Sequence, residues 1–140
     1  RKKIPATVDR RKNTVLDMQR ETPIFTLTLV SRQYYLVELK DDVEFGVPEM
    51  ELLVQLEREL YNQPLPVLVI CTPTTHTDSD FANYLGRNAN NPLSVADAFV
   101  IQSLPQKLLA HFYKVFVKPE RPTAFFKKER RCPGLAQAVS

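Results

Sequence analysis

The chain has 140 residues and a formal net charge of +3 at pH 7, a size typical of one ordinary domain. Hydrophobic residues make up 44% and charged residues 25%, which indicates a folded domain with a real core. The longest apolar run, Val67 to Cys71, is far too short to span a membrane, and we expect no secretory signal. Two cysteines are too few for a disulfide framework or for a zinc site built from cysteines alone, and three glycines are too few for a glycine-rich phosphate loop. We therefore expect no cofactor and no metal.

Charge is distributed unevenly along the chain. Residues 1–20 carry seven Lys and Arg against two Asp, residues 21–106 carry four basic against twelve acidic residues, and residues 107–140 carry eight basic against two acidic. The acidic middle would repel a phosphate backbone, so we do not expect a nucleic acid partner. We interpret the basic ends as a solvated leader and a helix with a basic outer face. The expected organisation is a basic flexible leader over 1–20, one domain over 21–130 and an atypical tail over 131–140.

The first half of the domain predicts a hairpin, a helix and a buried strand. Residues 24–30 and 34–39 are rich in β-formers and are separated by a short break, which is typical of two antiparallel strands. A helix is predicted from Pro48 to Tyr61, and the continuous apolar run 65–71 predicts a strand buried on both faces. The apolar positions that define the buried face of this helix are Met50, Leu53, Val54, Leu56, Leu60 and Tyr61.

The second half alternates helices and strands. Thr77 is predicted to cap a helix that runs to Leu85, and residues 95–101 predict another buried strand. Ser103 is predicted to cap a helix over 104–117, and a last strand is expected over 123–126, before a tail in which Pro133 interrupts any helix. The predicted apolar face of the 104–117 helix consists of Leu104, Leu108, Leu109, Phe112, Val115 and Phe116.

The order β-β-α-β-α-β-α-β predicts an α/β fold. Strands that alternate with helices make right-handed crossovers and a parallel core, and the opening hairpin adds an antiparallel edge. We therefore expect a mixed β-sheet, an N-terminal hairpin followed by β-α-β-α-β, with helices packed on it.

Several stretches between about Tyr34 and Lys127 together form a family pattern. They are Leu68-Val69-Ile70, Thr77 to Leu85, Ala96 to Ile101, Ser103-Leu104-Pro105, His111-Phe112-Tyr113, Lys118-Pro119 and Pro122-Thr123-Ala124-Phe125. In these stretches the chain resembles a group of small bacterial STAS-like proteins, which share the fold of anti-sigma-factor antagonists and sulfate-transporter tails. The resemblance implies a non-enzymatic, regulatory protein-interaction module in the bacterial cytoplasm, with an unidentified protein partner or a homodimer.

The chain departs from the family pattern in three features. Anti-sigma-factor antagonists carry a phosphorylated serine in an Asp-Ser-Ser/Thr-Gly motif, whereas this chain has Cys71 to Ser79 there, so a phosphorylation switch is not carried over. Ile70-Cys71 also replaces an acidic residue of the related group. Proteins of the group usually end in an amphipathic helix. The segment from Cys132 can be written in codons that encode such a helix when the reading frame is shifted by one base. We therefore hypothesise a frameshifted ending.

The best candidate site is the loop that follows the central strand. In open α/β sheets, ligands gather at such loops, and backbone N–H groups at a helix start attract anions. The expected residues of this partner-binding or anion-binding loop are Thr72, Thr74, Thr75, His76, Thr77, Asp78 and Ser79.

Other candidates have simpler structural explanations. Cys71 and His76 could form a nucleophile and base, but no orienting group or oxyanion motif is visible, so no catalytic residue is expected. Asp78 and Asp80 are explained by helix capping, and His111 by an ordinary helix position. The residues expected to be core or, where exposed, to form a dimer face or apolar pocket are Leu108, Phe112, Tyr113 and Phe116. The alternative function is a small apolar ligand or lipid carrier, with a pocket between the sheet and the 104–117 helix.

Overall fold

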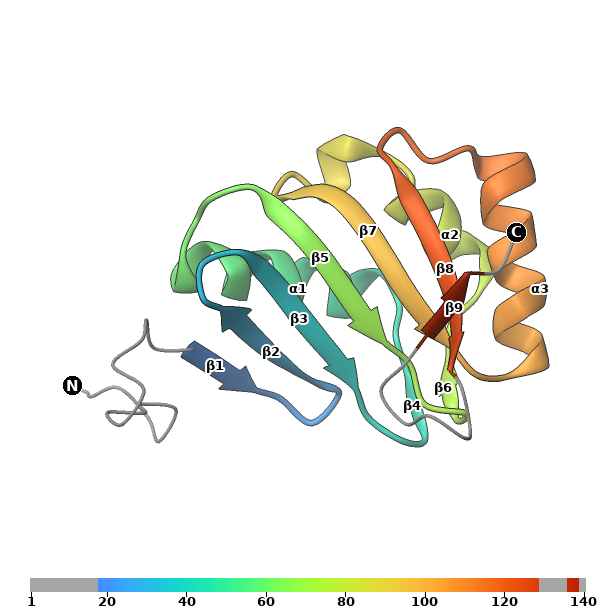
Figure 1. Cartoon of the computed structure of the whole chain (residues 1–140), viewed down its shortest axis with the longest axis horizontal. Coiled ribbons are helices and arrows are strands. Elements are labelled where there is room, and N and C mark those ends of the chain that lie inside the picture. Colours follow the sequence, from blue (N-terminus) through green and yellow to red (C-terminus); the bar gives the residue numbers. More distant parts are fainter. Residues whose placement is uncertain (1–17, 129–135, 139–140) are drawn as a thin grey trace.

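Within the described part of the chain, seven strands form one mixed β-sheet in the order β1-β2-β3-β5-β7-β8-β9 (Figure 1). This computed structural model describes residues 18–128 and the backbone of 136–138. Strands β3, β5, β7 and β8 pair in parallel, whereas β1, β2 and β9 make antiparallel pairs at the two edges. The strand bounds are Met18–Glu21 (β1), Phe25–Val30 (β2), Tyr34–Leu39 (β3), Leu65–Ile70 (β5), Ser94–Ile101 (β7), Thr123–Lys128 (β8) and Ala136–Ala138 (β9).

Each connection between the parallel strands contains a helix, which confirms the predicted α/β class with a mixed sheet. The helices are α1 (Val47–Leu60), α2 (Ser79–Leu85) and α3 (Leu104–Phe112), and α3 continues into the π-helix η2 (Tyr113–Val117). Two short pieces were not predicted: the 3-10 turn η1 (Asn88–Asn90), and the parallel pair of β4 (Val43–Glu44) with β6 (Thr75–His76).

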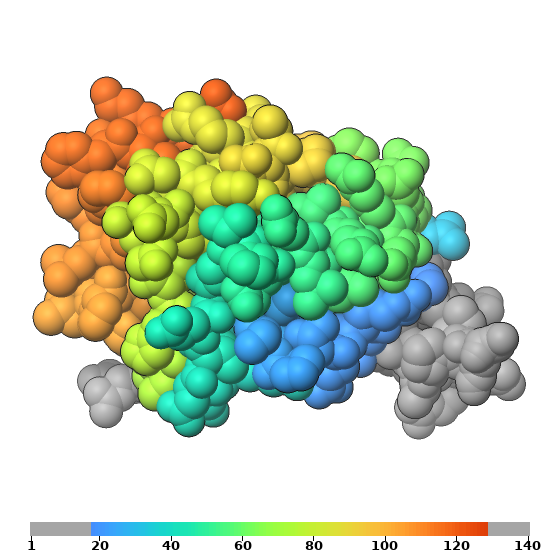
Figure 2. All heavy atoms as spheres, turned by 180° about the vertical axis from the view of Figure 1, so that it is seen from behind, coloured from blue at the N-terminus to red at the C-terminus, as the bar shows by residue number. Residues whose placement is uncertain are grey.

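The three helices lie on one face of the sheet (Figures 1 and 2). The parallel strands β3, β5, β7 and β8 follow one another across the sheet in chain order. Right-handed crossover connections between them therefore all place their helices on the same face of the sheet. The prediction that residues 65–71 and 95–101 are buried on both faces is therefore wrong. Pro66 and Val95 are exposed, and Leu68 and Ala98 are only half-buried, because no described helix covers the second face.

The core lies between the sheet and the helices. Phe25, Leu27 and Tyr35 from β2 and β3 are completely buried against the helical layer. On α1 the fully buried positions follow helical spacing, which confirms the predicted amphipathic helix. They are Met50, Leu53, Glu57 and Leu60, so a carboxylic acid occupies one core position.

The two ends of the domain differ from expectation. Residues 18–20, assigned to the leader, form most of β1 and pair with β2, because antiparallel pairing extends the hairpin by one more strand. Residues 136–138, within the expected tail, pair with β8 as strand β9. The rest of the expected leader and most of the expected tail lie outside the described residues. Among the helices that the structure describes, none combines the length and the apolar character that a membrane crossing requires.

Candidate functional site

The threonine hydroxyl groups of the predicted binding loop are engaged in hydrogen bonds within the domain, whereas Ser79 is exposed at the start of α2. Thr75 Oγ1 accepts a hydrogen bond from the Thr72 N–H at 3.0 Å and donates one to the Lys40 carbonyl at 3.3 Å. Thr74 Oγ1 accepts from the Asp42 N–H at 2.8 Å and donates to Asp41 Oδ1 at 3.3 Å. These contacts join the loop to the segment that follows β3, so the threonines there have a structural role.

The start of α2 differs by one residue from the prediction. Asp78, not Thr77, is the N-cap, and its Oδ1 accepts a hydrogen bond from the Phe81 N–H at 2.9 Å. The Thr77 hydroxyl is used elsewhere, because it donates to the Phe45 carbonyl at 2.7 Å. The prediction of a Thr77 cap was therefore wrong, while the capping interpretation of Asp78 is confirmed.

The loop borders an open groove of about 420 Å³ that lies between the starts of α1 and α2. His76 is exposed at this groove, and the acidic residues that line it are Glu44, Glu49, Asp78 and Asp80. Four carboxylates make the groove unfavourable for an anion. Among the described residues, no group of three or more His, Cys, Asp or Glu side chains could hold a metal ion.

Cys71 does not have the properties of a nucleophile. It is buried at the end of β5, and burial raises the pKa of its thiol to about 12. At neutral pH the thiol is therefore protonated, whereas nucleophilic attack requires the thiolate. His76 is exposed on the loop, and its hydrogen bond is made by the backbone, because its carbonyl accepts from the Phe45 N–H at 2.8 Å. The structure thus gives no support for a Cys71–His76 catalytic pair.

Helix α3 turns a different face to the core than the one predicted. Its buried residues, together with those of η2, are Gln106, Ala110, Tyr113 and Val117. Four residues expected on the buried face are exposed instead: Leu104, Leu108, Val115 and Phe116. The other two, Leu109 and Phe112, are half-buried and pack against the core, as predicted.

Polar anchoring of Gln106 explains this orientation. Its Nε2 donates hydrogen bonds to the carbonyls of Thr72 at 2.7 Å and Thr75 at 2.9 Å, and its Oε1 accepts one from the Gln102 N–H at 2.7 Å. The Ser103 hydroxyl completes a capping box with Gln106, which confirms Ser103 as the predicted cap. Because Gln106 is held against the loop, the side of the helix that carries Leu104 and Leu108 faces outward.

The exposed side of α3 and η2 combines an apolar stripe with a basic one. Leu104, Leu108, Phe112 and Phe116 recur every four residues, and the Phe112 and Phe116 rings lie 5.6 Å apart between centroids. The neighbouring stripe consists of Lys107, His111, Lys114 and Lys118, and residues 104–118 contain no acidic residue. Interaction with the Lys127 side chain of β8 lowers the pKa of Lys107, which shows that positive charge is crowded here.

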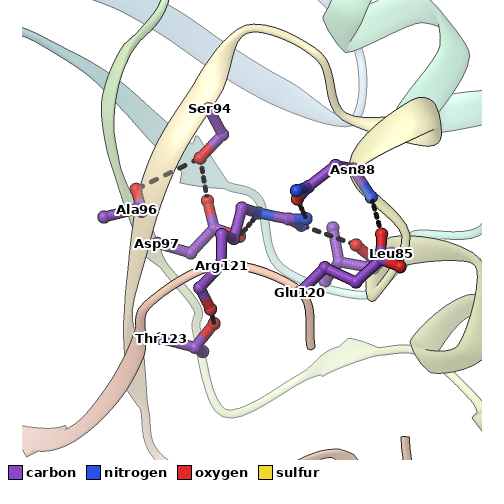
Figure 3. Close-up of polar contacts among 8 residues, drawn as sticks. All are labelled: Leu85, Asn88, Ser94, Ala96, Asp97, Glu120, Arg121 and Thr123. Carbon is purple, nitrogen blue, oxygen red and sulfur yellow. Dashed lines mark hydrogen bonds and ion pairs between the residues drawn. The ribbon is translucent and has the colours of Figure 1, made fainter. Parts of the chain in front are cut away.

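Arg121 and Asp97 form a buried ion pair (Figure 3). Arg121 Nε donates to Asp97 Oδ2 at 2.7 Å, and the Ser94 hydroxyl donates to the other oxygen of Asp97. The guanidinium group also donates to Asn88 Oδ1 at 3.0 Å and to the Leu85 carbonyl. The network joins β7, the end of α2 and the segment before β8, so its satisfied hydrogen bonds indicate a structural role.

The alternative prediction placed a pocket between the sheet and the 104–117 helix, but sequence reasoning missed the buried Glu57 and Asn91 there. The structure has a cavity of about 100 Å³ between the sheet and the three helices. Glu57 from α1, Asn91 from the loop before β7 and Tyr113 from η2 line it, and their buried oxygen atoms have no hydrogen-bond partner among the described residues. One signal was available, because Glu57 interrupts the apolar positions of α1 at helical spacing. The cavity is too small for a lipid chain, because lipid-sized and drug-sized ligands need pockets of several hundred Å³.

Comparison with known proteins identifies the family of the chain but not an activity. The family described as "Domain of unknown function (DUF7793)" matches residues 33–132, which include the loop, the α3 stripe and the buried cavity. No curated protein and no solved structure matches the chain. Because the matched region covers well over half of the sequence, the chain belongs to this family of domains of unknown function.

Proposed function

We propose that this protein is a non-enzymatic protein-interaction module whose contact surface is the α3 face, defined as Leu104, Leu108, Phe112 and Phe116. One observation carries the proposal: Leu104, Leu108 and Phe116 are 66%, 64% and 70% exposed on successive turns. Single exposed apolar residues are ordinary, but a contiguous stripe of large apolar side chains is typical of an interaction surface.

The charge beside the α3 face defines the chemistry of the partner. Lys107, Lys114 and Lys118 border the apolar stripe, and no described residue forms an ion pair with any of them. We propose a partner that presents an amphipathic helix with an apolar stripe bordered by Glu or Asp. Two copies of this chain joined through the α3 face would crowd lysines together, so charge favours the acidic partner over a homodimer.

The resemblance to STAS-like proteins supports a regulatory role in the cytoplasm, and both remain part of the proposal. A mixed sheet with all helices on one face is compatible with that resemblance. The Thr72–Ser79 loop would act indirectly, because Gln106 connects it to the start of α3. A change at the loop would therefore shift the orientation of the α3 face rather than create a separate ligand site.

A synthetic amphipathic peptide tests the partner chemistry. The peptide carries a Leu/Phe stripe bordered by Glu, and its binding is measured by fluorescence anisotropy against the wild type and the variants Leu108→Ser and Phe116→Ser. We expect each variant to weaken binding about tenfold, a loss typical of an exposed apolar anchor. Leu52→Ser is the matched control, because Leu52 is an exposed leucine on α1 and should leave binding unchanged.

Three outcomes would overturn the proposal. Equal binding of a second peptide with Lys in place of Glu would exclude charge recognition. Binding to phosphatidylglycerol vesicles that is lost in Leu108→Ser, without peptide binding, would indicate a membrane surface instead. A concentration-dependent dimer in sedimentation experiments that Leu108→Ser dissolves would make a second copy the partner.

A further inference from the structure

The buried cavity has features of a ligand site that the interaction surface does not explain. Its walls come from β3, β5, β7 and the three helices, and most of the lining side chains are apolar. Glu57, Asn91 and Tyr113 face it from three separate segments. The unpartnered atoms are both carboxylate oxygens of Glu57, Oδ1 of Asn91 and the hydroxyl oxygen of Tyr113.

A buried oxygen atom without a hydrogen-bond partner lowers the stability of the fold. Several such atoms in one cavity point to a ligand that forms hydrogen bonds with them. A buried polar group without a partner destabilises a fold by about 1–3 kcal/mol. Glu57 is completely buried, and burial, with a smaller contribution from the charge of Asp97, raises the pKa of its carboxyl group to about 8. Burial also raises the pKa of Tyr113. No described group donates a hydrogen bond to these oxygen atoms, and the hydroxyls of Tyr113 and of protonated Glu57 have no described acceptor.

The titratable groups around Glu57 are already paired or uncharged, so none of them forms an ion pair with its carboxyl group. Asp97 from β7 is already paired with Arg121, Tyr35 from β3 donates its hydroxyl to the Gln63 carbonyl at 2.7 Å, and Tyr113 carries no charge at neutral pH. No described Lys or Arg side chain contacts Glu57. A ligand that brings its own positive charge would therefore meet a carboxyl group that no cation of the described chain occupies.

We propose that this cavity binds a small primary ammonium ion with a short alkyl chain, with its head at Glu57, Asn91 and Tyr113 and its chain against the apolar walls. An ammonium group has three donors and no acceptor, which matches a site whose unpaired atoms are oxygens. The volume of about 100 Å³ is below that of an apolar cavity that admits benzene, so the ligand has about five non-hydrogen atoms or fewer.

Binding moves one proton in a balanced step. The ammonium ion enters with its charge, the Glu57 carboxyl group gives its proton to the buffer, and the resulting carboxylate pairs with the ammonium group. The net charge of the site is unchanged, and one proton is released for each ligand bound at a pH below the pKa of free Glu57.

Isothermal titration calorimetry with propylammonium chloride tests this inference on the full chain at pH 7, in two buffers of different ionisation enthalpy. We expect saturable binding with proton release, and binding of the neutral isostere propan-1-ol at least about tenfold weaker, because charge-assisted hydrogen bonds are stronger than neutral ones. Glu57→Gln should remove the selectivity and the proton release while the protein stays folded, as judged by circular dichroism. Glu59→Gln is the matched control, because Glu59 is exposed on the same helix.

Each alternative outcome overturns the inference. Equal binding of propan-1-ol would show a merely apolar cavity, and unchanged propylammonium binding by Glu57→Gln would place the ion elsewhere. A high-resolution crystal structure grown with propylammonium that shows only water at Glu57, Asn91 and Tyr113 would assign the cavity to hydration. None of these results depends on the α3 face, because both substitutions lie on α1.

Discussion

Arg121 and Asp97 form an ion pair whose side chains are only 3% and 2% exposed, with 2.7 Å between Arg121 Nε and Asp97 Oδ2. The two residues come from the segment before β8 and from the middle of β7. Their remaining polar atoms contact Ser94, Asn88 and the Leu85 carbonyl, so the pair also fixes the end of α2. This network holds together the second half of the helical layer.

Replacing only one residue of the Arg121–Asp97 pair should lower the free energy of unfolding far more than replacing both. Arg121→Met leaves Asp97 buried without a cation, and we expect it to lower the free energy of unfolding by about 3–5 kcal/mol. The double variant Asp97→Leu/Arg121→Met should recover much of that loss, since no buried charge remains. Urea denaturation followed by circular dichroism measures both values. Equal stability of the two variants would show that the charge pairing is energetically unimportant.

Glu57 should make the stability of the domain depend on pH. Its pKa is about 8 in the folded protein and near 4.5 in the unfolded chain, so the folded state holds the proton more tightly. The stabilisation from the protonated group is fully present below pH 4.5 and is lost as the pH rises towards 8. Relative to Glu57→Gln, the wild type should lose about 1.4 kcal/mol per pH unit across this window. Urea denaturation at pH 5, 6, 7 and 8 measures the difference, and a constant difference would contradict the buried carboxylic acid.

Gly86 should be intolerant of a side chain because α2 meets η2 there. A Cβ atom at Gly86 would lie 2.5 Å from Val117 Cγ1, which is shorter than any normal contact. We expect Gly86→Ala to cost about 1–3 kcal/mol through overpacking. Val117→Ala should relieve the clash, so a double-mutant cycle by thermal denaturation should show a favourable coupling. Additive effects of the two substitutions would mean that these segments are not in contact.

Cys71 should be protected from thiol reagents in the folded protein. Burial raises its pKa to about 12, so little thiolate exists at pH 8, and the residue is only 9% exposed. In a Cys132→Ser background, labelling by iodoacetamide should be slow under native conditions and fast in urea, as read by mass spectrometry. Rapid native labelling would restore Cys71 as a candidate nucleophile.

Much of the fold could be predicted because its main elements have strong local patterns. The runs of β-forming residues in β2, β3 and β5 and the helical spacing of α1 are contained in the sequence itself. The two-residue strands β4 and β6 have no such pattern, since they form only when Val43 and Glu44 meet Thr75 and His76. The one-sided coverage of the sheet also depends on the direction of the crossovers rather than on local sequence.

The candidate site was harder to predict because long-range contacts decide it. Leu104 and Phe116 have the spacing of a buried stripe, but hydrogen bonds from Gln106 to a loop 31 and 34 residues earlier turn that stripe outward. The loop threonines resemble an anion site in the sequence, yet their partners lie near the end of β3. Glu57 left a readable signal, because a charged residue at a core position of an amphipathic helix points to burial or function.

Chemical-shift mapping of the acidic peptide on the ¹⁵N-labelled protein tests the central claim most directly. The account predicts that the perturbed amides are confined to residues 104–118 and the neighbouring end of β8, and that added salt weakens the interaction because lysines border the surface. Perturbations centred on the Thr72–Ser79 loop or the open face of the sheet, with residues 104–118 unaffected, would contradict the claim that the α3 face is the interaction surface.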